Sequence, residues 1–158
     1  MKVRLERGTT VVFVAGTAPQ PKGTSMLAWV NMSSRRRHRQ EVPAASRATA
    51  EWMALCSALR RVRSGRKIVV ITACSLLLAE FRDWLPFAEN RVRVVARTRQ
   101  LINQHGLDVH VYWLPGRLNR AAKLVRRYIV AQKEQVLPRR LGGFLDLRNG
   151  QQRGVRSR

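Results

Sequence analysis

Val11-Val12-Phe13-Val14, followed at once by Ala15-Gly16-Thr17, is the stretch of this sequence that decides the fold. Four consecutive apolar residues, three of them β-branched, predict a buried strand. Gly and Pro are frequent in residues 15–23, which predicts a turn-rich loop after that strand. A second strand is predicted over residues 25–32, and the basic run at residues 35–39 follows on a third strand or hairpin edge that ends at Pro43. The β-branched run at residues 68–72 predicts another buried strand.

Helices are predicted between and after these strands. Ser46 or a near neighbour caps a helix that we expect to run to Ser64-Gly65, where glycine is a natural stop. An apolar residue recurs along it at helical spacing, which gives one apolar face: Trp52, Leu55, Leu59 and Val62. All four tryptophans, which include Trp29, Trp84 and Trp113, sit in apolar patterns and are expected in the core.

The remaining elements complete a mixed pattern. Residues 75–85 are predicted helical up to Pro86, residues 92–104 form a further helix, residues 109–114 a strand, and residues 118–135 a basic helix. The order strand, strand, strand, helix, strand, helix, helix, strand, helix predicts an α/β domain. Its mixed central sheet of about five strands carries flanking helices.

Charge is the strongest functional signal. The 158 residues contain 31 Lys plus Arg against 9 Asp plus Glu, a formal net charge of +22. This excess predicts a polyanionic partner, and nucleic acid is the commonest one. Arg outnumbers Lys, which favours bidentate phosphate contacts. No apolar run is long enough to span a bilayer. No membrane association is expected, and cytoplasmic residence is the default.

Domain organisation follows from composition. We expect a domain over residues 1–136 and a basic, poorly ordered extension over residues 137–158, which includes Arg139 and Arg140. The two cysteines, Cys56 and Cys74, form no disulfide framework or zinc pattern and are expected to be buried thiols.

Four short segments, in this order, resemble ribonuclease HI and its relatives. Residues 12–17 resemble the family's first strand, residues 49–55 its glutamate-bearing helix, and residues 70–75 the strand that ends in Thr-Asp-Ser. Trp113-Leu114-Pro115-Gly116 and residues 118–123 resemble the last strand and the start of the last helix. The resemblance implies an RNase H-like fold and hydrolysis of the RNA strand of an RNA–DNA hybrid by two divalent metal ions.

The metal-binding residues of the family are mostly replaced in this chain. The resemblance implies four carboxylates, Asp, Glu, Asp and Asp, and the matching positions are Ala15, Glu51, Ala73 and either Lys123 or Ala122. One carboxylate does not hold two metal ions. We therefore predict a catalytically degenerate member with no metal site. No cofactor is expected, and Mg²⁺ or Mn²⁺ enters only if the site functions. Either natural loss or engineered replacement explains the pattern. Lys123 is predicted to pair with Glu51, to contact a phosphate, or to face solvent.

Nucleic-acid contacts are predicted on the retained scaffold. The resemblance places a groove beside the four matching positions, and basic residues elsewhere add phosphate contacts. The candidate residues are Gly16, Thr17, Gln20, Arg35, Arg36, Arg37, Arg39, Arg47, Thr49, Arg117, Asn119, Arg120, Lys123, Arg139 and Arg140. For each, ordinary turn, cap or edge-strand chemistry is the competing interpretation.

Three functions stay open at this point. The first is a pseudoenzyme that binds RNA–DNA hybrid or structured RNA without cutting it. The second is a structural RNA-binding component of a larger ribonucleoprotein assembly. The third is a metal-dependent hybrid endoribonuclease that takes ligands from elsewhere, with Asp83 and Asp108 as candidates. The sequence favours the first.

Overall fold

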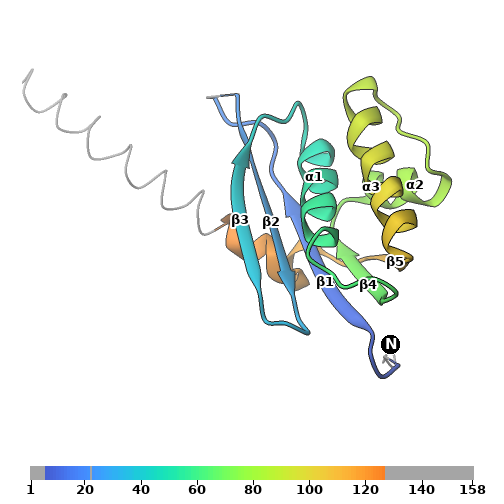
Figure 1. The fold of residues 1–158 in the computed structure, drawn as a ribbon. Helices are drawn as coiled ribbons and strands as arrows, with labels where there is room; N and C mark the ends of the chain where they lie inside the picture. Colours follow the sequence, from blue (N-terminus) through green and yellow to red (C-terminus); the bar gives the residue numbers. More distant parts are fainter. Residues whose placement is uncertain (1–5, 22, 127–158) are drawn as a thin grey trace, which may run out of the picture. The chain divides into compact units, whose positions relative to one another are not determined.

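A computed structural model describes residues 6–21 and 23–126 of the chain (Figure 1). Its elements are the strands β1 (Thr10–Gly16), β2 (Ser25–Asn31), β3 (Arg37–Val42), β4 (Lys67–Thr72) and β5 (Asp108–Trp113), the helices α1 (Arg47–Leu59), α2 (Ser75–Asp83) and α3 (Val92–His105), and the 3-10 turns η1 (Glu89–Arg91) and η2 (Gly116–Leu118). Residues 120–126 begin one more helix. No described helix is long and apolar enough to cross a membrane.

The strands form one mixed sheet in the order β3-β2-β1-β4-β5. The first three are antiparallel neighbours, whereas β4 and β5 run parallel to β1. The carboxyl ends of β1, β4 and β5 therefore meet at one end of the sheet. This architecture confirms the predicted α/β class and the predicted order of elements.

The core lies between the sheet and α1. Trp52, Leu55 and Leu59 from α1 are fully buried against β-branched side chains of the central strands, such as Val14 and Val70. In Figure 1, α1 and α3 cover one face of the sheet, and the helix that begins at residue 120 lies behind the sheet. Every side chain of β1 and β4 is buried or partly buried, which is why those two strands read as apolar runs.

Some predicted boundaries were wrong. Helix α1 ends at Leu59, about one turn before Ser64-Gly65, although its cap at Ser46 is confirmed by the bond from the Thr49 N–H. The chain leaves the helix through a turn in which the Val62 N–H bonds to the Leu59 carbonyl, so Val62 still reaches the core. The apolar spacing continues past Leu59 for that reason. Cys56 and Cys74 are buried and free, as predicted.

Gly16 permits the close approach of β1 to α1. A Cβ added at Gly16 would lie 2.7 Å from the backbone nitrogen of Glu51 and 2.8 Å from the Cβ of Ala50. Backbone atoms of a packed helix do not yield as a flexible side chain does. The position therefore requires glycine for space and not for a left-handed conformation.

Replacement of Gly16 by alanine should lower the free energy of unfolding by about 1–3 kcal/mol, because the added methyl forces α1 away from β1. Gly116→Ala is the matched control, since its Cβ would have 3.9 Å of clearance from Ala73. Urea denaturation of both variants checks this. Equal stability of the two variants would contradict the role given to Gly16.

The site around Glu51

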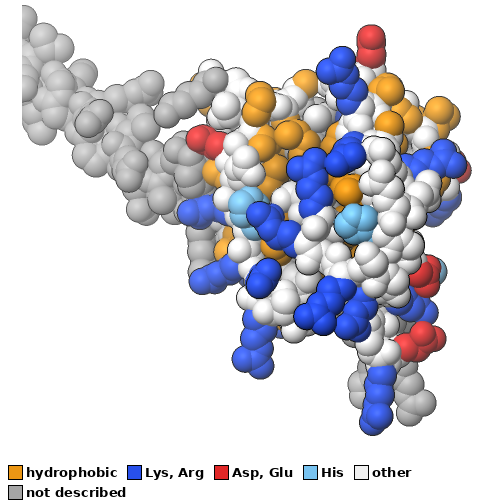
Figure 2. Space-filling model, viewed as in Figure 1, with side chains coloured by type: hydrophobic (Ala, Val, Ile, Leu, Met, Phe, Trp, Pro, Cys, Tyr) orange, Lys and Arg blue, Asp and Glu red, His pale blue; other side chains and the backbone are white. Residues whose placement is uncertain are grey.

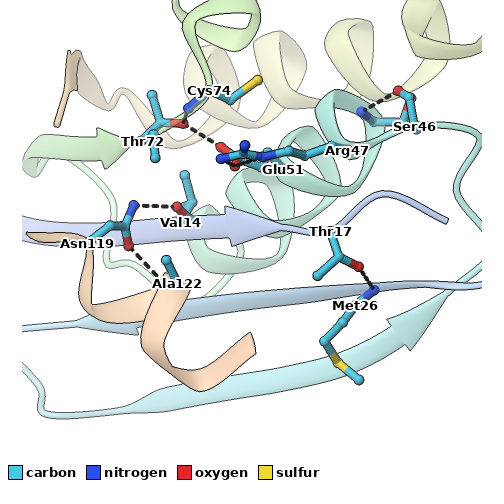
Figure 3. A network of polar contacts seen from close by, with 12 residues as sticks. Val14, Thr17, Met26, Ser46, Arg47, Glu51, Thr72, Cys74, Asn119 and Ala122 are labelled. Carbon is cyan, nitrogen blue, oxygen red and sulfur yellow. Dashed lines mark hydrogen bonds and ion pairs between the residues drawn. The ribbon is translucent and has the colours of Figure 1, made fainter. Parts of the chain in front are cut away.

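Three of the positions that the resemblance singled out, Ala15, Glu51 and Ala73, lie at the carboxyl ends of β1 and β4. Figure 3 shows Glu51 beside Thr72 at this end of the sheet, with Asn119 and the start of the last helix nearby. Ala15 is the penultimate residue of β1, and Ala73 follows the last residue of β4. Gly16 brings Glu51 on α1 against the end of β1. The predicted neighbourhood is therefore present, although it holds a single carboxylate.

Glu51 is completely buried and is held by three elements. The Thr72 hydroxyl at the end of β4 donates a hydrogen bond to its carboxylate, and the backbone N–H of Gly16 in β1 donates another. Arg47, one turn earlier on α1, places Nε 3.3 Å from the same carboxylate, while half of its side chain remains exposed. Thr72 also accepts the N–H of Cys74, which begins α2.

The electrostatics of Glu51 are dominated by its burial. Desolvation raises the pKa of the Glu51 carboxyl, and the Thr72 hydrogen bond, the charge of Arg47 and the Gly16 N–H offset part of that rise. The thiol of Cys74 responds in the same direction: burial raises its pKa, and the nearby Glu51 charge raises it further. Both effects favour the protonated form of the Cys74 thiol.

Asn119 fixes the last helix to the same end of the sheet. Its amide Nδ2 donates to the carbonyl of Val14 at 2.9 Å and to that of Ile71 at 3.5 Å. Its Oδ1 accepts the N–H groups of Ala121 and Ala122, which caps the helix that begins at residue 120. The side chain is fully buried. Asn119 thus positions the helix that carries Lys123.

The residues present do not fit a pair of divalent metal ions. Glu51 is the one carboxylate at the four positions, and its oxygens already accept bonds from Thr72 and Arg47. Within residues 6–21 and 23–126, no three His, Cys, Asp or Glu side chains group together as metal ligands would. Arg47 supplies a positive charge at the place where metal ions require negative ones.

Three hypotheses are corrected by these contacts. The ion pair of Glu51 is made with Arg47, while Lys123 is exposed, so the predicted Lys123–Glu51 pair is not formed among the described residues. Asp108 starts β5 and pairs with His110, about 16 Å along the strand from the Thr72 end of the sheet. Asp83 ends α2, at the opposite terminus of that helix from the site. Neither aspartate is placed to complete a metal site.

The other predicted contact residues fall into two groups. Some use their polar groups internally: the Thr17 hydroxyl accepts the Met26 N–H, Thr49 closes the cap of α1, and Gln20 bonds to the loop carbonyl of Ala18. Exposed cations make up the second group: Arg35, Arg36, Arg37, Arg39, Arg117, Arg120 and Lys123. Arg139 and Arg140 lie outside the described residues.

The structure also divides the exposed cations between the two ends of the sheet. Arg117, Arg120 and Lys123 belong to the Glu51 end, since they flank Asn119. The β2–β3 hairpin carries Arg35 and Arg36 to the other end, where Asn31 pairs with Val12 early in β1. A single groove does not contain all the predicted residues.

Trp113 was predicted in the core, and this prediction was wrong. It remains 48% exposed, and its indole N–H donates to the Ala73 carbonyl at 3.1 Å. Trp113 continues the face of Val109 and Val111, which pack against the core, but it is the last residue of a sheet-edge strand. The edge position of β5 follows from the strand order of the sheet, which the apolar pattern of the sequence does not give. Trp29, Trp52 and Trp84 do pack in the core, as predicted.

A five-stranded mixed sheet in this order, with the site at the carboxyl ends of β1 and β4, defines the class of fold. No protein-family model and no curated protein matches the sequence. Solved structures do match. The N-terminal RNase H domain of a Mycobacterium tuberculosis protein, solved as a fusion with maltose binding protein, superposes with a TM-score of 0.65 at 15% identity, over 80% of this chain and 97% of that one.

Two further structures are similar to a comparable degree. RNase H1 from the halophilic archaeon Halobacterium salinarum has a TM-score of 0.62 at 17% identity, and LC11-RNase H1 in complex with RNA/DNA hybrid has 0.64 at 15%. Each match covers 75% of this chain and 94% of the other. The chain therefore has the RNase H-like fold, as the resemblance implied.

The buried Glu51 carboxyl should make stability depend on pH. Because its folded-state pKa is raised, the contribution of Glu51 to the free energy of unfolding is fully present below its unfolded pKa and is lost as pH rises through the raised value. Urea unfolding across this pH range should show that loss in the unchanged protein and not in Glu51→Gln. The exposed Glu89→Gln is the control and should keep the loss. The prediction would be contradicted if the free energy of unfolding of Glu51→Gln changed with pH in parallel with that of the unchanged protein.

Proposed function

We propose that this protein binds an RNA-containing duplex or structured RNA and does not hydrolyse it. One observation carries the proposal: the four positions that match the family's carboxylates hold a single carboxylate, and that carboxylate is paired with Arg47, in a chain of net charge +22. A surface of this charge attracts phosphates directly, whereas a hydrolytic site needs clustered carboxylates to hold metal ions first.

Exposed groups around Glu51 support binding at this end of the sheet. Arg117, Arg120 and Lys123 are exposed beside the buried Asn119. The half-exposed guanidinium of Arg47 lies one turn from Glu51. Cations of this kind contact phosphates irrespective of base sequence, which suits recognition of duplex shape.

The exposed Trp113 ring adds an apolar contact at the same end. Its bond to the Ala73 carbonyl fixes the indole, so little side-chain entropy would be lost on contact with a ribose or a base. The crystallised LC11-RNase H1 binds RNA/DNA hybrid on a similar scaffold, which is the reason to test that ligand first.

Binding and cleavage should separate in one experiment. Labelled RNA–DNA hybrid, double-stranded RNA, single-stranded RNA and DNA duplex are titrated with protein in Mg²⁺ or Mn²⁺ across a salt series. We expect salt-sensitive binding to hybrid or structured RNA, with every strand left intact. Metal-dependent cutting of the RNA strand that disappears in Glu51→Gln would overturn the proposal.

Restoring the carboxylates should restore metal binding. A triple variant, Ala15→Asp, Ala73→Asp and Lys123→Asp, places four carboxylates at the positions that match the family's and should bind Mn²⁺ by calorimetry, because like-charged carboxylates are stabilised by a divalent cation. The matched triple Asn variant keeps side-chain size without the charge and should not bind. A folded Asp variant without Mn²⁺ binding would show that these positions do not form the expected site.

A further inference from the structure

The end of the sheet opposite Glu51 carries a cavity of about 670 Å³ lined by four arginines. They come from segments far apart in the sequence: Arg36 from the β2–β3 hairpin, Arg61 and Arg63 from the turn after α1, and Arg66 from the residue before β4. Figure 2 shows Lys and Arg side chains gathered over the lower part of the molecule, where Figure 1 places the hairpin and this turn. None of the lining residues is an acid.

Local contacts hold Arg61 and the hairpin that carries Arg36. The Arg61 guanidinium lies 5.5 Å from the centroid of the Trp29 ring. The hairpin that presents Arg36 is closed by the Asn31 side chain, which accepts the N–H groups of the two residues that begin the turn. These contacts reduce the entropy that ligand binding would otherwise cost.

The positive charge of this cavity is not neutralised by the described part of the protein. None of the four arginines forms an ion pair with a described carboxylate, and the nearby Glu6 pairs with Lys67 instead. Like charges that converge on one cavity repel each other, and a bound anion converts that repulsion into attraction. A bound anion would therefore compensate the arginine charges that no described carboxylate compensates.

The lining chemistry selects phosphate among anions. Guanidinium groups form bidentate hydrogen bonds to phosphate oxygens. Four residues with hydroxyl side chains, Thr9, Thr10, Ser33 and Ser34, also line the cavity. These small donors suit the remaining oxygens of a phosphate better than a flat carboxylate, which has only two oxygens to bind.

We infer that this arginine cavity is a second phosphate-binding site, which contacts the backbone of the same polynucleotide that binds at the Glu51 end; this inference rests on the proposed function. Arg35, Arg37 and Arg39 are exposed and continue the positive charge from the cavity along β3. A polynucleotide, which carries a row of phosphates, would use this extended charge, whereas a single small anion would not. The two ends of β1 are about 20 Å apart. That distance corresponds to about six nucleotide steps of a strand.

The test compares two charge-matched variants. The cavity variant replaces Arg36, Arg63 and Arg66 by Gln and leaves Arg61 on Trp29. The control replaces Arg82, Arg93 and Arg97, which are exposed and lie outside the cavity. Both lose three positive charges. Urea unfolding and circular dichroism establish that each variant is folded before binding is compared.

Affinity for an RNA–DNA hybrid of about 16 base pairs is measured across a salt series. Each lost phosphate contact lowers the slope of log affinity against log salt by about 0.7–0.9. The cavity variant should therefore lose about two units of slope and at least about ten-fold in affinity, with a smaller loss in the control. Hybrids of about five base pairs, which are too short to reach both ends, should show little difference between the variants.

The other outcomes are distinguishable. Equal losses of hybrid affinity in the two variants would overturn the cavity site and leave the proposed function unaffected. An unchanged protein that binds no nucleic acid would overturn both. Pyrophosphate is titrated separately. If it binds the unchanged protein but not the cavity variant, while hybrid binding is the same in both, the cavity takes free phosphate compounds and the polynucleotide assignment fails.

Discussion

The buried carboxylate of Glu51 is the constraint on which the functional end of this fold depends. An anion without solvent must be satisfied by its surroundings, and the donors come from three elements: Gly16 in β1, Thr72 in β4 and Arg47 in α1 itself. Each donor fixes one element relative to the others. At the same place Gly16 lets the backbones of β1 and α1 pack closely together.

A second buried pair extends the same principle to the helices. Glu80 in α2 is fully buried and receives Arg91 at 2.8 Å and 3.0 Å, together with the N–H of Phe87 at 2.8 Å. Arg91 also reaches the Ser46 hydroxyl that caps α1. The segment between α2 and α3 is therefore tied to the start of α1. In the described residues, buried carboxylates hold elements in place, while most Lys and Arg side chains are exposed.

The order of elements could be predicted because strands β1 and β4 are covered on both faces and read as apolar runs, and because α1 carries a regular apolar stripe. The pairing of Glu51 was missed although Arg47 lies four residues before it, a helical spacing that brings two side chains together. Trp113 was misplaced because composition cannot distinguish the end of an edge strand from a core strand. The four arginines of the cavity lie up to 30 positions apart in the sequence, so only the tertiary fold could reveal that they share a cavity.

The Glu51 site and the arginine cavity have one property in common: both carry positive charge at an end of the sheet. In the RNase H family that the sequence resembles, clustered carboxylates repel a phosphate backbone until divalent ions neutralise them. At the matching positions of this chain Glu51 is the one carboxylate, and it is paired with Arg47. Under the proposed function, a phosphate approaches the Glu51 end without a counter-ion, and the four arginines at the opposite end would favour the same partner. Fixed positive charge in place of clustered carboxylates is thus the physical reason for proposing binding without hydrolysis.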